Sequence, residues 1–210
     1  MTPQLSTQLV WFRHDLRLAD QPALAAAAAR GAVAALFVLD DETPGAFGSG
    51  WAMGAAQRWW LHHSLASLSR DMAARGGRLI LRRGRAGPIV KALAAELGAD
   101  IHAIVHHEPW AHTQEAEAGA ITRHHGATLA PPASVLSGTG GRYRIFTPWW
   151  KRLSEQMPPP RPLPVPEVRW ADVGGVASDD LDAWGLLPRA PDWAGGFADW
   201  QPGEAGAAAR

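Results

Sequence analysis

The chain has 210 residues, 47% of them hydrophobic, which is enough to bury one sizeable core. Lysine plus arginine and aspartate plus glutamate each number 20, so the net charge of zero gives no general attraction to nucleic acid or acidic membranes. The absence of cysteine excludes disulfides, thiolate metal sites and a cysteine nucleophile. No apolar run is long enough to span a membrane, and Met1 to Ser6 lacks the features of a signal peptide, so we expect a cytoplasmic protein.

Short apolar runs with the composition of buried strands alternate with helical patterns in the first 130 residues. The strands are expected at residues 7–12, 33–39, 78–81, 101–105 and 127–129. The helices between them are expected at residues 23–30, at 61–72, from Pro88 to Gly98 and from Pro109 to His125. Asp20 has a side chain suited to an N-cap, and we expect it to cap the first helix.

Strands that are apolar throughout and alternate with helices specify a parallel sheet that is covered on both faces. We therefore predict an α/β fold for residues 1–130: a doubly wound, Rossmann-like sheet of five parallel strands with helices on both faces. Residues 131–210 are rich in proline and tryptophan, and we expect an extended connector with one short helix. Because tryptophans recur along this connector, we expect it to lie against a folded surface. They are Trp170, Trp184, Trp193 and Trp200.

Ligands of open α/β sheets bind beyond the carboxyl ends of the strands. Polar segments follow four of the expected strands, at residues 13–17, 40–42, 82–87 and 106–110. None contains the glycine pattern of a standard dinucleotide site or of a P-loop. The segment RRGRAG (82–87) is either an anion cradle or a solvated basic loop.

Adjacent histidines at residues 62–63, 106–107 and 124–125 raise the question of a metal site. Neighbouring side chains point to opposite faces of a strand and diverge on a helix, so these pairs do not chelate as pairs and we expect no metal. No serine lies in a G-x-S-x-G pattern, so the sequence offers no candidate nucleophile for a serine hydrolase. We assign no catalytic residue.

The segment VWFRHDLRLADQPAL (10–24) resembles the amino-terminal signature of the DNA photolyase/cryptochrome family. Further segments resemble later parts of the same family in the same order, so the resemblance covers nearly the whole chain. They are ALFVLDDE (35–42), RWWLHHSLASLSRDMAARGGRLILRRG (58–84), HHEPWAHTQEA (106–116), GRYRIFTPWWKRL (141–153) and PDWAGGFADWQPGEAGA (191–207). The resemblance implies a deoxyribodipyrimidine photo-lyase-like protein of light-dependent DNA repair, whose α/β domain binds a light-harvesting antenna chromophore.

The resemblance also implies a chromophore site at the strand-end edge. Its candidate residues are Asp40, Asp41, Arg58, Glu108 and Trp110. Folate-binding members of the family carry an Asn-Glu pair where Trp110 and Ala111 stand, which favours a flavin or deazaflavin over a folate. The polar residues of the first loop, in segment 13–20, either touch the chromophore or form internal ion pairs that tie the loop to neighbouring helices.

Family members continue into a helical domain that holds FAD and the damaged base, and we expect this chain to stop before it. The chain alone is then expected neither to hold FAD nor to repair DNA. We expect damaged DNA to bind only through the helical domain. Expected partners are a separately encoded FAD-binding helical half, or a second copy through an exposed connector face. One alternative is a stand-alone nucleotide- or flavin-binding module of the electron-transfer-flavoprotein or universal-stress type, with SGTGGR (137–142) as its phosphate loop. Another is a remnant without function.

Overall fold

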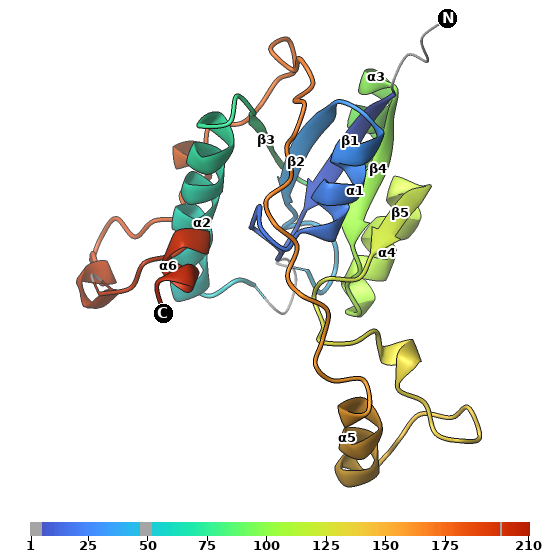
Figure 1. Cartoon of the computed structure of the whole chain (residues 1–210). Helices are drawn as coiled ribbons and strands as arrows, with labels where there is room; N and C mark the ends of the chain where they lie inside the picture. Colours follow the sequence, from blue (N-terminus) through green and yellow to red (C-terminus); the bar gives the residue numbers. More distant parts are fainter. Residues whose placement is uncertain (1–5, 47–51, 198) are drawn as a thin grey trace, which may run out of the picture.

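The computed structural model describes residues 6–46, 52–197 and 199–210, and its centre is a five-stranded sheet (Figure 1). All neighbouring strands pair in parallel, in the order β3-β2-β1-β4-β5. The strands are β1 (Thr7–Phe12), β2 (Val33–Leu39), β3 (Leu79–Arg83), β4 (Ala99–Ile104) and β5 (Ile121–His124). The strand order reverses beside β1, which places a switch point between β1 and β4. The predicted doubly wound α/β fold is confirmed.

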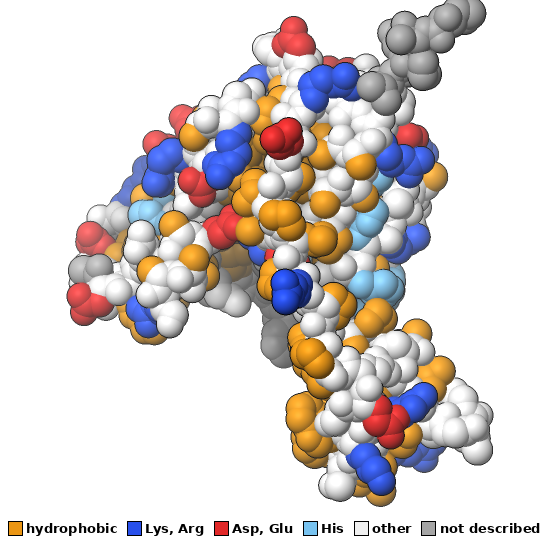
Figure 2. Space-filling model, viewed as in Figure 1, with side chains coloured by type: hydrophobic (Ala, Val, Ile, Leu, Met, Phe, Trp, Pro, Cys, Tyr) orange, Lys and Arg blue, Asp and Glu red, His pale blue; other side chains and the backbone are white. Residues whose placement is uncertain are grey.

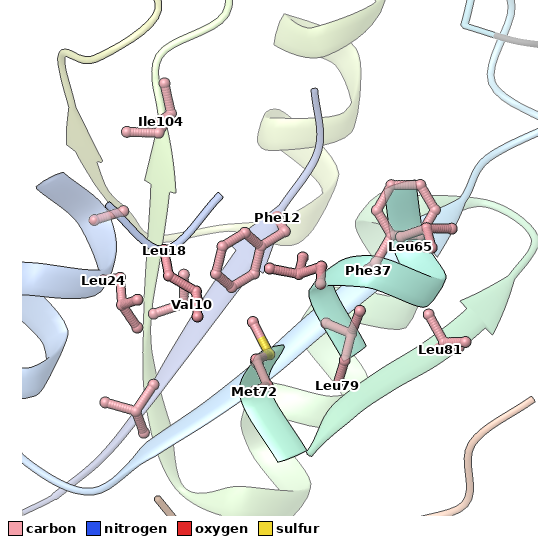
Figure 3. Packing of buried hydrophobic residues seen from close by; sticks show 14 of the residues in the cluster. Val10, Phe12, Leu18, Leu24, Phe37, Leu65, Met72, Leu79, Leu81 and Ile104 are labelled. Carbon is pink, nitrogen blue, oxygen red and sulfur yellow. The ribbon is translucent and has the colours of Figure 1, made fainter. Parts of the chain in front are cut away.

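Helices cover both faces of the sheet. They are α1 (Pro22–Arg30), α2 (Ala55–Ala73), α3 (Ala86–Leu97) and α4 (Pro109–Ala118). Successive residues of β1 point to opposite faces, so Val10 and Phe12 join a core with α1 and α2, whereas Leu9 and Trp11 join a core with α3. Figure 3 shows the first core, in which side chains of α2 pack onto those of the central strands.

The predicted fifth strand was placed wrongly. Strand β5 lies at Ile121–His124, not at residues 127–129, because α4 ends at Ala118 instead of continuing to His125. Gly119 ends the helix with a φ of 96°, a conformation that glycine adopts without steric cost. Because β5 is an edge strand, it is only partly buried and carries polar residues. The same composition would suit the exposed face of a helix, so the sequence did not distinguish the two.

The predicted cap of the first helix was also wrong by one residue. Gln21 is the N-cap of α1, and its side-chain oxygen accepts a hydrogen bond from the backbone N–H of Ala23 at 3.1 Å. Asp20 instead has a φ of 49°, and its carboxylate accepts a hydrogen bond from the N–H of Leu163 in the connector.

The connector runs back along the sheet after α5 (Phe146–Ser154), as Figure 1 shows in orange. It forms a parallel bridge between Trp170 and Val33, and the N–H of Asp179 donates to the carbonyl of Leu81 at 2.8 Å. Trp170 and Trp184 pack against the first core, as expected, whereas Trp193 and Trp200 are 38% and 48% exposed. In the described part of the connector, the other elements are three short 3₁₀ helices (Pro132–Ser134, Asp182–Trp184 and Ala194–Phe197) and α6 (Glu204–Ala208).

Within the described parts of the chain, no helix has both the length and the apolar character needed to cross a membrane. The expectation about a signal peptide falls mainly on residues 1–5, which lie outside the described residues.

Candidate functional site

A cavity of 470 Å³ lies beyond the carboxyl ends of β1 and β2, between α2, the start of α4 and α6. This volume is in the range of small-molecule and cofactor sites. Most of its wall is apolar or aromatic: Trp11, Leu16, Phe37, Val38, Met53, Trp60, Leu61, Ala86, Trp110 and Ala207. The polar lining consists of Arg13, His14, Arg17, Asp40, Gln57, Ser64, Gln114 and Glu204, with Gly203 beside them.

Asp40 lines the cavity and is held by hydrogen bonds from three segments. Its carboxylate accepts from the N–H and hydroxyl of Thr43 at 2.8 and 2.6 Å, from the N–H of Ala86 at 2.9 Å, and from the amide of Gln114 at 2.6 Å. A further bond comes from the N–H of Glu42 at 3.1 Å. Burial alone would raise the pKa of Asp40, but these donors outweigh it and the pKa is lowered. Asp40 therefore joins the end of β2 to the start of α3 and to the middle of α4 beside the cavity.

Trp110 stands in the first turn of α4 and supplies a flat aromatic wall. Its ring centroid lies 5.5 Å from that of His14 and 6.1 Å from that of His106. Burial, followed by the nearby imidazole of His106, lowers the pKa of His14. His14 is therefore held in its neutral form at neutral pH, and the cavity gains aromatic surface without a charge.

The polar residues after β1 form internal contacts. The Arg13 guanidinium donates to the Glu115 carboxylate at 2.9 Å and to the carbonyl of Ile104. Asp15 accepts from the Arg13 N–H at 2.9 Å and from the Gln21 side chain. These contacts support the interpretation that the loop is tied to neighbouring helices, although Arg13 and His14 also line the cavity.

Three of the five candidate residues lie elsewhere. Asp41 and Arg58 line a second cavity of 140 Å³ that shares Met53 with the first. Asp41 forms an ion pair with Arg83 at 2.6 Å, and Arg58 donates to the carbonyl of Gly185 at 3.3 Å. Glu108 is absent from the described residues that line either cavity, and its carboxylate accepts from the N–H of His107 at 3.0 Å. The structure thus brings together Asp40 and Trp110 of the predicted set.

The two candidate anion loops make contacts within the chain. In RRGRAG, Arg83 pairs with Asp41 and Arg85 with Glu117, and the N–H of Ala86 is taken by Asp40. The loop SGTGGR folds into a tight turn in which the Gly140 N–H donates to the Ser137 carbonyl at 2.8 Å. Figure 1 shows this part of the chain beside α5, away from the sheet. Among the described residues, no three His, Asp or Glu side chains are grouped to hold a metal ion.

Sequence reasoning missed several cavity residues. Trp11 and Phe37 lie inside strands whose continuous apolar runs do not reveal which residues face a cavity. Glu204 comes from α6, and its side chain reaches the loop after β1, 186 residues away in the sequence. No local pattern signals a contact over that separation.

Comparison with known proteins gives a consistent result. The family model described as DNA photolyase matches residues 8–167. A deoxyribodipyrimidine photo-lyase of Agrobacterium fabrum is 36% identical over 219 aligned residues, covering 99% of this chain and 44% of that protein. Cryptochrome-1 of Arabidopsis thaliana is 31% identical over 90% of this chain and 30% of its own length. The chain thus spans less than half the length of these relatives.

Solved structures agree with the sequence comparison. The crystal structure of a bacterial class III photolyase from Agrobacterium tumefaciens superposes with a TM-score of 0.87 at 35% identity, covering all of this chain and 44% of that one. An archaeal photolyase from Sulfolobus tokodaii, described with two FAD molecules, has a TM-score of 0.67 at 17% identity over 86% of this chain and 41% of its own, which shows a shared fold alone. From the family match over residues 8–167 and the relatives that cover almost all of its length, this chain belongs to the DNA photolyase family.

Proposed function

We propose that this chain is the light-harvesting part of a photolyase and that the 470 Å³ cavity holds its antenna chromophore. The observation that carries the proposal is the cavity itself, which lies at the strand ends and is walled by Trp11, Phe37 and Trp110. Aromatic walls of this kind bind a planar conjugated ring through stacking and apolar burial. The bound chromophore would supply absorption of near-ultraviolet and blue light, and these side chains would hold and orient it.

The ionised side chains around the cavity already make contacts within the chain. Arg13 pairs with Glu115, which also pairs with Arg123, and the Arg17 guanidinium donates to the carbonyls of Asp20 and Gly126. The Asp40 carboxylate is occupied by donors from its own chain. Two nitrogens of the buried Arg13 guanidinium, Nε and Nη1, have no hydrogen-bond partner among the described residues, so the cavity does not exclude an anionic group on the chromophore.

A flavin or deazaflavin ranks ahead of a folate for two reasons. The pterin ring of a folate presents adjacent N–H and amino donors, which pair best with a free carboxylate, and the Asp40 oxygens already accept five hydrogen bonds. Trp110 and Ala111 also stand where the family resemblance places the Asn-Glu pair of folate-binding members. The archaeal photolyase described with two FAD molecules shows that this fold occurs in a protein with a second flavin.

Repair of pyrimidine dimers in DNA by this protein is a further proposal, because the chain spans 44% of its photo-lyase relative. It requires an FAD-binding helical part, which we propose as a partner of the α/β domain. Exposed apolar side chains next to and within α5 suit such a partner or a second copy of this chain; Ile145 and Phe146 are 69% and 68% exposed. Figure 2 shows hydrophobic side chains gathered on the part of the molecule that contains α5. The cytoplasmic location stays a prediction.

The proposal is tested by titrating the purified chain separately with flavin mononucleotide, a deazaflavin and a methenyl folate. Binding is followed by quenching of tryptophan fluorescence and by circular dichroism induced in the chromophore band. We expect saturable binding of a flavin or deazaflavin with induced dichroism, because the ring becomes fixed against chiral walls. If only the folate binds, the antenna role is supported but the preference for a flavin or deazaflavin is wrong. If none of the three binds, the antenna role is rejected.

A further inference from the structure

The carboxyl-terminal helix α6 forms one wall of the cavity. Gly203, Glu204 and Ala207 all line it, although they lie in the segment most distant in sequence from β1. Figure 1 shows α6 in red beside α2, on the same side of the sheet. The wall therefore depends on contacts that hold α6 in place.

The Glu204 carboxylate makes two of these contacts. Its Oε2 accepts a hydrogen bond from the N–H of Leu18 at 2.7 Å, and its Oε1 accepts one from the N–H of Ala19 at 2.8 Å. Both donors belong to the loop between β1 and α1, which also supplies Leu16 and Arg17 to the cavity wall. One side chain thus fastens two walls of the same cavity through charge-assisted hydrogen bonds.

A close backbone contact places α6 against α2. Gly203 has a φ of 99°, and a Cβ atom at this position would lie 2.6 Å from the Ser67 hydroxyl oxygen and 2.7 Å from the Ser67 Cβ. Only glycine allows this approach. Trp200 also packs edge-on against Trp60 of α2, with ring centroids 6.2 Å apart.

We infer that Glu204 is a positioning residue for the antenna site: by clamping α6 to the loop after β1, it sets how long a chromophore stays bound. This inference rests on the proposed function. Replacement of Glu204 by glutamine leaves one oxygen acceptor and turns an NH₂ group toward a backbone N–H, so at least one of the two bonds is lost. The wall would then open more often, and the bound ring would leave faster.

The first test needs no ligand and measures hydrogen exchange at single amides. In Glu204→Gln we expect at least one of the amides of Leu18 and Ala19 to exchange at least tenfold faster than in the unmodified chain. The matched control is Glu155→Gln, because Glu155 pairs with Arg152 on α5, away from the cavity. Unchanged exchange at both amides in Glu204→Gln would overturn the clamp.

The second test measures dissociation of flavin mononucleotide by stopped-flow recovery of tryptophan fluorescence. We expect the dissociation rate to rise about tenfold in Glu204→Gln and also in Gly203→Ala, which displaces α6 through a different contact, but not in Glu155→Gln. Binding with an unchanged rate in both variants would reject the positioning role and leave the proposed function intact. If the unmodified chain binds no flavin mononucleotide, the antenna role for that ligand fails, and the amide exchange still decides whether Glu204 clamps α6.

Discussion

The Arg13 guanidinium and the Glu115 carboxylate form a buried ion pair, with 2.9 Å between Nη2 and Oε1 and side chains that are 5% and 3% exposed. The pair joins the loop after β1 to α4, so it connects two walls of the cavity. The second Glu115 oxygen accepts from the Nε of Arg123 at 2.6 Å. Burial lowers the pKa of Arg13, and the Glu115 carboxylate opposes that effect.

Glu115→Gln should lower the free energy of unfolding by about 3–5 kcal/mol, because it leaves the buried Arg13 charge without its partner. Urea denaturation at neutral pH measures the change. The control is Glu117→Gln, whose ion pair with Arg85 is solvent-exposed and should contribute far less to stability. Equal losses in the two variants would show that the buried pair has no special structural role.

Asp40→Asn should destabilise the fold by about 2–3 kcal/mol at neutral pH, because an amide cannot accept all the bonds that the carboxylate accepts. The pKa of Asp40 is lowered in the folded chain, so its contribution is present above the unfolded-state pKa of about 3.9 and is lost as the pH falls through the folded-state pKa. The difference in unfolding free energy between the unmodified chain and Asp40→Asn should therefore shrink below that pH. A difference that stays constant through this range would contradict the assignment.

His102 should make stability depend on pH in a milder range. It is fully buried in β4, where its ring lies 3.0 Å from the ring nitrogen of His124 and 2.8 Å from the side-chain oxygen of Gln8. Burial, the nearby His124 and Arg30 lower its pKa to about 4. The folded chain therefore resists protonation that the unfolded chain accepts from a pH near 6.5 downward.

Between pH 6.5 and pH 4, the unmodified chain should lose about 3 kcal/mol more unfolding free energy than His102→Gln, which cannot titrate. Denaturant melts of both proteins at a series of pH values measure this loss. Parallel stability curves would mean that His102 keeps an ordinary pKa in the folded state.

Trp110→Leu should weaken chromophore binding by about 1–3 kcal/mol, on the scale of a lost aromatic stacking contact, while leaving the fold intact. Equilibrium titration with flavin mononucleotide measures the effect. Trp150→Leu is the matched control, since Trp150 lies on α5 and is 48% exposed. Similar losses in both variants would place the ring outside the cavity.

The sequence was sufficient to predict the sheet because strands such as Val33–Leu39 are apolar throughout and are bounded by clear breaks. It failed at β5, where an edge strand needs no continuous apolar run and Ile121–His124 could equally continue a helix. The prediction that Asp20 caps α1 was wrong because the neighbouring Gln21 is the N-cap. The Asp20 carboxylate instead accepts a hydrogen bond from the N–H of Leu163, a distant residue of the connector.

The candidate site was predictable only in part. The family resemblance, together with the rule that ligands bind at strand ends, led to Asp40 and Trp110, both of which line the cavity. The same rule could not separate Asp40 from its neighbour Asp41, because adjacent side chains point in different directions and only the fold decides which one faces the cavity. The sequence could not predict that Glu204 lines the cavity, since its position depends on how α6 packs against α2.

The decisive measurement is an absorption spectrum of the freshly purified chain in the near-ultraviolet and blue, followed by mass spectrometry of the molecule released on denaturation. We predict a band in this range and a released mass that matches a flavin or deazaflavin. A chain that shows no such band, and gains none after incubation with flavin, deazaflavin and folate, would contradict the conclusion that its cavity is an antenna site.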